Sequence, residues 1–154
     1  QQGVTRREPV RMTTRMTADE ANSFLGAAFP NTGNRSEVVL MEEGRAKMRL
    51  VADETHLRPG GYISGPTQMS LVDSVAYMAV MTLTGHEPMT VTSNLSINFL
   101  RPCIGDVVVA DARVMKIGQA LAVMDVDVRI EGAEKPSSHA VVTYALPRKP
   151  ETAQ

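Results

Sequence analysis

The residue best suited to chemistry in this sequence is Asp73, which stands alone in a long apolar segment. From Pro59 to Gly85 the chain reads PGGYISGPTQMSLVDSVAYMAVMTLTG, and Asp73 is its one charged residue. Nearly every position from Met69 to Leu83 is apolar, which predicts a helix that is buried on all sides. A carboxylate is seldom buried without a reason, and action as a base or nucleophile is a common one. The alternative is that Asp73 hydrogen-bonds a neighbouring group and fixes the position of the helix.

Polar side chains gather in the N-terminal half of this predicted helix. Its spacing puts three hydroxyl residues on one stripe, flanked by Asp73 and Tyr77; they are Thr67, Ser70 and Ser74. Beyond Tyr77 the helix is almost wholly apolar. We therefore expect function at the start of the helix and packing at its end.

The start of the helix offers unpaired N–H groups to a carbonyl oxygen that gains negative charge. Pro66 suits the first turn, where its missing N–H needs no partner, and Gly85 suits the C-terminal end. Gly65 has no Cβ to keep a ligand from the backbone. Because Pro66 has no N–H, the donor is Gly65 or a residue after Pro66.

The elements around this helix have the pattern of a sheet with one apolar face. Six segments alternate in the way strands do, namely 36–41, 45–52, 90–100, 106–116, 121–131 and 139–146. In 90–100 the alternation puts Val91, Leu95, Ile97 and Phe99 on one face and Thr92, Asn94, Ser96 and Asn98 on the other. The breaks between the last four segments are short enough for antiparallel neighbours. A short helix over 17–29, N-capped by Thr17 with Glu20, precedes the strands.

Composition narrows the class of protein. The chain has 154 residues, 43% hydrophobic and 21% charged, which is typical of one soluble domain. A net charge of −1 gives no reason to expect nucleic acid or a membrane surface as a partner. One cysteine, Cys103, excludes an internal disulfide and fits a cytoplasmic location. We expect a flexible arm over 1–16, a single domain over 17–147 and a tail over 148–154.

The chain resembles the hotdog-fold acyl-CoA thioesterases of the phenylacetate-pathway, or PaaI-like, type over roughly residues 17–147. The resemblance rests on SGPTQMSLVDSVAYMA, on INFLRP at 97–102, on the Lys116-Ile-Gly-Gln hairpin and on the final HAVVTYALP. Related sequences usually carry His-Gly-Gly before the helix and Leu-Ala-Asp within it. Here the same span reads Ser64-Gly65-Pro66 and Leu71-Val72-Asp73, so the Asp is retained but the loop His is not.

This resemblance implies an α+β hotdog fold, an antiparallel β-sheet wrapped around a central apolar α-helix, and hydrolysis of acyl-CoA thioesters. It implies sites at a dimer interface, where Asp73 of the neighbouring subunit meets a carbonyl polarised near Gly65. Along one straight helix these residues are ~12 Å apart, too far to act on one atom. Asp73 would attack the carbonyl or deprotonate a water, and both roles stay open. Asn22 falls near where the family often places an Asn or Gln that orients water or thioester; alternatively it faces solvent.

The expected partners are the acyl-CoA substrate and further copies of the chain, as a homodimer or homotetramer, because one sheet layer leaves its edges uncovered. The candidates for substrate contact are Ser64, Pro66, Thr67, Ser70, Ser74 and Tyr77. No metal or nucleotide motif occurs, so no cofactor is expected.

Two other functions stay open from the sequence. A hotdog hydratase or dehydratase needs a His that works with the carboxylate, and only His56 lies near the loop before the helix. A non-catalytic acyl-CoA-binding protein would gain nothing from a buried charge, which argues against it. The missing loop His argues for it.

Overall fold

The computed structural model of the protein describes residues 14–28 and 36–148. These residues form two α-helices, one 3₁₀ turn (η1) and six strands. In chain order the elements are α1 (Ala18–Ala28), β1 (Ser36–Glu42), β2 (Arg45–Val51), η1 (Glu54–His56), α2 (Gly65–Thr84), β3 (Val91–Phe99), β4 (Val107–Ile117), β5 (Leu121–Ile130) and β6 (Ser138–Ala145). All six predicted strands are confirmed, each within one residue at either end.

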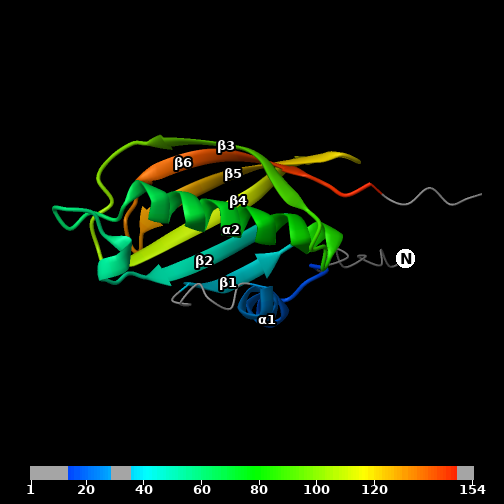
Figure 1. Cartoon of the computed structure of the whole chain (residues 1–154), viewed down its shortest axis with the longest axis horizontal. Helices are drawn as coiled ribbons and strands as arrows, with labels where there is room; N and C mark the ends of the chain where they lie inside the picture. The colour runs from blue at the N-terminus through cyan, green and yellow to red at the C-terminus, as the bar shows by residue number, and fades with distance from the viewer. Residues whose placement is uncertain (1–13, 29–35, 149–154) are drawn as a thin grey trace, which may run out of the picture.

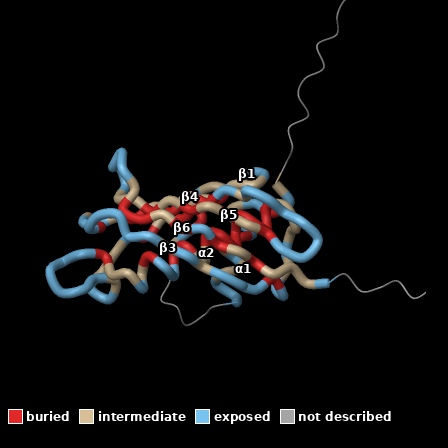
Figure 2. Tube along the Cα trace, turned by 90° about the horizontal axis from the view of Figure 1, so that it is seen from above, coloured by how far each residue is buried: buried red, intermediate tan, exposed pale blue. Residues whose placement is uncertain are grey.

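The strands form one antiparallel sheet that curves around α2, with α1 beside the β1 edge (Figure 1). The buried residues lie along α2 and along the strands of the sheet, in the middle of the molecule (Figure 2). In α2, all residues from Val75 to Thr82 are buried, and they pack on inward strand residues such as Met48, Val126 and Val142. Removing this apolar surface from water contributes about 1.5–3 kcal/mol for each large side chain. The predicted wrapped helix is therefore confirmed.

The N-terminal half of α2 is more open than predicted. Met69 is 41% exposed, Ser70 is exposed and Asp73 is half-buried. The prediction of a helix buried on all sides therefore holds only for its C-terminal part. The polar side chains lie where the helix is open, as expected from their position in the sequence.

The order of the strands corrects one expectation. The sheet runs β1-β2-β4-β5-β6-β3, so β3 pairs with β6 at an edge and not with β4, the next strand in the chain. The segment between them crosses about 14 Å, three inter-strand spacings, which seven extended residues span easily. Two hydrogen bonds fix this connecting segment, because the N–H groups of Leu100 and Arg101 donate to the Ser137 carbonyl. The short connection between β3 and β4 therefore does not make these two strands neighbours in the sheet.

A bulge in β3 corrects a second expectation. The register with β6 shifts between Thr92 and Asn94. One extra residue reverses the faces of the side chains before it. Thr92 therefore lies opposite Tyr144 on the inner face, and Val91 turns outward and is 56% exposed. Beyond the bulge the predicted faces are correct.

The start of the domain also differs from the prediction. Met16, which we assigned to the arm, is 3% exposed and belongs to the core. The N–H of Arg15 donates to the Thr82 carbonyl in the last turns of α2. Arg15 and Met16 therefore contact the domain, while residues 1–13 of the predicted arm and residues 149–154 lie outside the described part of the chain. Within that part, no helix is both long and apolar enough to cross a bilayer.

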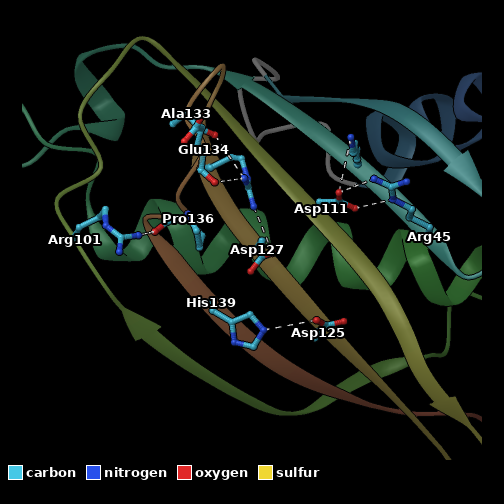
Figure 3. A network of polar contacts seen from close by, with 11 residues as sticks. Arg45, Arg101, Asp111, Asp125, Asp127, Ala133, Glu134, Pro136 and His139 are labelled. Carbon is cyan, nitrogen blue, oxygen red and sulfur yellow. Dashed lines mark hydrogen bonds and ion pairs between the residues drawn. The ribbon is translucent and has the colours of Figure 1, made fainter.

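Charged side chains cover the outer face of the sheet, away from α2 (Figure 3). Arg45 and Asp111 form an ion pair at 2.9 Å, and His139 lies 3.7 Å from Asp125. These groups are partly exposed, so each pair contributes little to stability, roughly 0–1 kcal/mol. The chemistry predicted for Asp73 lies on the opposite, inner face.

Candidate active site

The first turn of α2 leaves one N–H group for a ligand. Ser64 is the N-cap: its hydroxyl accepts from the Thr67 N–H at 3.2 Å, and its carbonyl accepts from the Gln68 N–H at 3.1 Å. Pro66 has no N–H. The Gly65 N–H finds no acceptor among the described residues. It is thus the donor that the start of this helix can offer to a carbonyl oxygen.

The hydroxyls of Ser64 and Thr67, both predicted to contact substrate, hold the loop before the helix. Their oxygens are 2.7 Å apart, and Thr67 also donates to the His56 carbonyl at 3.2 Å. The Ser64 N–H donates to that same carbonyl at 2.9 Å. His56 in turn closes η1, because its Nδ1 accepts from the Asp53 N–H. These hydrogen bonds therefore fix the conformation of the loop without a histidine at position 64.

The space beside Gly65 is limited by a close neighbour. A Cβ built on Gly65 would lie 3.3 Å from Cζ of Phe99 in β3, which is tighter than an ordinary contact. Nearby, the buried side chain of Gln68 accepts from the Ser138 hydroxyl at 2.8 Å and donates to the Ile63 carbonyl at 3.3 Å. The start of α2 is thus fixed to the sheet at the end where β3 and β6 pair.

Asp73 lies two turns further along α2, between β3 and β6. Its Oδ1 accepts a hydrogen bond from the Thr92 hydroxyl at 2.7 Å and from the Tyr144 hydroxyl at 2.6 Å. Oδ2 accepts no hydrogen bond within the described ranges. The half-buried carboxylate therefore has one held oxygen and one free oxygen.

Two stacked tyrosines support the carboxylate from the core side. Tyr144 and Tyr77 lie with ring centroids 5.6 Å apart and planes 9° apart. Burial and the hydrogen bond to Asp73 raise the pKa of Tyr144 above its ordinary range, so its hydroxyl stays a donor. Tyr77, predicted to contact substrate, is buried, and its hydroxyl donates to the Glu87 carbonyl at 2.8 Å. Tyr77 therefore packs in the core, and its contact with substrate stays a prediction.

The remaining candidates lie in different places. Ser70 is exposed and Ser74 half-buried on the open side of α2, and Pro66 is exposed in its first turn. Asn22 is far from them: its amide oxygen accepts from the Val38 N–H at 2.8 Å, and its amide nitrogen donates to the Val38 carbonyl at 3.0 Å. It thereby pairs α1 with β1, the sheet edge opposite β3. Within one subunit, Asn22 does not reach Asp73.

Sequence reasoning missed both residues that hold Asp73. Thr92 was assigned to the outer face, and only the bulge brings it inward. Tyr144 carried a readable signal, because alternation in β6 places it on the same inner face as Ala140 and Val142.

The other reactive side chains do not join this site. His86 packs edge-on against Phe24 with ring centroids 4.7 Å apart, and His139 faces Asp125 on the outer face. Cys103 is buried, and this burial raises the pKa of its thiol. Among the residues described, no cluster of three or more His, Cys, Asp or Glu side chains could hold a metal ion.

An open groove of about 460 Å³ lies where β5 ends and β6 begins. Its charged lining residues are Arg101, Lys135 and Glu134, and Ser137 also lines it. Ser137 precedes Ser138, whose hydroxyl donates to Gln68 in the first turns of α2. The groove therefore lies at the same end of the sheet as the start of α2.

Comparisons with known proteins agree with this geometry. The sequence model of the thioesterase superfamily matches residues 60–137, which include Gly65, Asp73 and Thr92. A provisionally assigned thioesterase from Silicibacter sp. TM1040 is 34% identical, with 90% of this chain and 96% of that chain covered and a TM-score of 0.81. Zebrafish thioesterase superfamily member 2 has a TM-score of 0.76 at 24% identity over 86% of this chain and 99% of its own. A provisionally named esterase from Thermoplasma acidophilum is 29% identical over 73% of this chain and 83% of its own length. The sheet around α2 is therefore the predicted hotdog fold.

Proposed function

We propose that this chain, which belongs to the thioesterase superfamily, hydrolyses acyl-CoA thioesters and is of the PaaI-like type. The observation that carries the proposal is the carboxylate of Asp73, with Oδ1 held by two hydroxyls and Oδ2 free. A carboxylate in this state can take a proton or attack an acyl carbon. The reaction adds water across the bond between acyl carbon and sulfur, and it yields a carboxylic acid and free coenzyme A.

The proposed site is shared by two subunits. Asp73 follows Gly65 by eight residues in α2, a rise of ~12 Å, so the two cannot contact one carbonyl group within a subunit. Two α2 helices that pack antiparallel in a dimer bring the start of one beside the middle of the other. Large apolar side chains are exposed where such a partner would lie, at Met69 on α2 and at Phe99 and Leu100 along the edge strand β3. We therefore propose a homodimer, alone or within a homotetramer.

In the proposed reaction the Gly65 N–H of one subunit donates to the thioester oxygen as that oxygen gains negative charge. Oδ2 of Asp73 from the other subunit takes a proton from water while the water oxygen attacks the acyl carbon. Alternatively Oδ2 attacks the carbon itself, and water then cleaves the resulting anhydride. In both routes the carbon–sulfur bond breaks, and the sulfur leaves with the electron pair and takes up a proton.

The groove lined by Arg101 and Lys135 supports coenzyme A as the thiol part of the substrate. Arg101 and Lys135 can bind phosphate groups, with Glu134 as the one acidic residue in the lining, and the groove lies at the end of the sheet where α2 begins. The hydratase alternative needs a histidine beside the carboxylate, and within one subunit none of the three histidines contacts Asp73. His56 lies near the start of α2, but its Nδ1 accepts from the Asp53 N–H.

Thiol release from a panel of short, medium, long and aryl acyl-CoAs tests the proposed function. Each acyl group is also offered on pantetheine, which lacks the nucleotide phosphates. We expect turnover of at least one acyl-CoA, with a lower KM than for the matching pantetheine thioester. Acyl-CoA that binds without thiol release would contradict hydrolysis and establish a binding protein. Equal KM values for the two thiols would contradict coenzyme A as the recognised group.

A further inference from the structure

The two oxygens of the Asp73 carboxylate are not equivalent in this structure. Thr92 from β3 and Tyr144 from β6 both donate to Oδ1, at 2.7 Å and 2.6 Å. Oδ2 receives no donor from the part of the chain that the structure describes. One side chain from each of two neighbouring strands thus donates to Oδ1 of Asp73 in α2.

Tyr144 is itself firmly held. It is 3% exposed, and its ring stacks on Tyr77. Its hydroxyl also contacts the main-chain carbonyl of Asp73 at 2.8 Å, as well as the side chain. The single hydroxyl proton is shared between this carbonyl and Oδ1, and this three-centre contact restricts the rotation of the Asp73 side chain. The terminal torsion of an aspartate is otherwise broad, so without such a restraint either oxygen can face the ligand.

We propose that Tyr144 is a positioning residue, which together with Thr92 pins Oδ1 of Asp73 and thereby leaves Oδ2 as the reacting oxygen. This inference rests on the proposed function and names the atom that acts in the same site. The burial of Tyr144 keeps its hydroxyl protonated, so the restraint persists at every pH at which the enzyme would be assayed. Orientation matters because a displacement of about 1 Å at a reacting group can cost on the order of 100-fold in rate.

The test removes the two hydroxyls separately and keeps the side-chain shapes. Tyr144→Phe and Thr92→Val should each lower kcat by roughly 10- to 100-fold and leave KM within about twofold. Thr92→Ser retains the donor and should recover most of the lost kcat. A purely structural role would lower stability and leave kcat per folded molecule unchanged.

Thr82→Val is the matched control for loss of a hydroxyl. Thr82 is a buried residue near the far end of α2, where its hydroxyl accepts from the Gly44 N–H at 2.8 Å and donates to the Ala79 carbonyl at 2.7 Å. This variant should unfold more easily than the wild type, with kcat per folded molecule unchanged. A Tyr144→Phe enzyme that behaves like Thr82→Val would overturn the inference.

Crystal structures of the unliganded wild type and the Tyr144→Phe and Thr92→Val variants separate this inference from the proposed function. We expect the carboxylate of Asp73 to be single in the wild type and rotated or in two orientations in the variants. A carboxylate that stays in place in both variants overturns the inference, even if the wild type hydrolyses acyl-CoA. If the wild type hydrolyses no acyl-CoA, the proposed function is wrong. The position of the Asp73 carboxylate in the variants still decides whether Tyr144 and Thr92 restrain it.

Discussion

A site made by two subunits can be tested by complementation between two inactive variants. Asp73→Asn removes the carboxylate, and Gly65→Pro removes the N–H donor at the start of α2. Removing one such donor typically lowers the rate by about 10²–10³-fold. If Gly65 of one subunit works with Asp73 of the other, a mixed dimer contains one site in which both residues are intact and one in which both are altered.

The expected recovery follows from counting sites in the mixture. Random exchange of equal amounts gives about half mixed dimers, and each mixed dimer has one intact site of two. The mixture should therefore regain about a quarter of the wild-type kcat. Neither variant alone should exceed about 1% of it. The assay is thiol release after unfolding and refolding the two differently tagged variants together.

Gly65→Ala is the control for the glycine change. Alanine and proline both add a Cβ 3.3 Å from Cζ of Phe99, and both precede Pro66, but alanine keeps the N–H. Gly65→Ala should thus lose much less activity than Gly65→Pro. The reasoning is refuted if isolated mixed dimers are no more active than the two parents, because the residues would then not meet across the interface.

Two further predictions concern the framework of the site. Asn22→Ala removes both hydrogen bonds from α1 to the Val38 backbone, so urea denaturation should show a free energy of unfolding lower by roughly 1–3 kcal/mol; a loss of kcat at unchanged stability would instead support the catalytic role predicted from the sequence. Burial raises the pKa of Tyr77, and burial together with the hydrogen bond to Asp73 raises that of Tyr144, while unfolded tyrosine titrates near about 10. The unfolded chain therefore loses these protons first, so stability is complete below about pH 10 and falls as the pH rises further. Urea midpoints at pH 9 and pH 11 should show this fall, and it should be smaller in Tyr144→Phe; an equal fall in both proteins would contradict the assignment.

The sequence was sufficient for the elements of this fold because their signals are local. The apolar run of α2 and the alternation of the six strands predict each element within a residue or so. One apolar sheet face and an apolar helix also predict that the sheet wraps the helix, and the resemblance implies the same arrangement. The position of β3 in the sheet has no local signal in the sequence. Its place beside β6 depends on pairing across the whole sheet, and the short segment before β4 is compatible with either neighbour.

The site was predictable only in part, for a similar reason. Asp73 was conspicuous as one charge among apolar residues, and Gly65 and Pro66 follow the rules of helix starts. The inward orientation of Thr92 depends on a β-bulge, and no residue type in β3 indicates that bulge. Contact of Ser64 and Thr67 with substrate stays a prediction, and the sequence does not reveal that the His56 carbonyl lies beside their hydroxyls.

The most direct test of the central claim is kcat of Asp73→Asn with the best acyl-CoA, at an oligomeric state verified by light scattering. Asp125→Asn is the matched control, since Asp125 is a carboxylate on the outer face of the sheet. We predict that Asp73→Asn lowers kcat by about 10²–10⁴-fold and that Asp125→Asn stays within about twofold of the wild type. Equal activity of Asp73→Asn and the wild type would contradict the account, because the carboxylate would then have no part in the reaction.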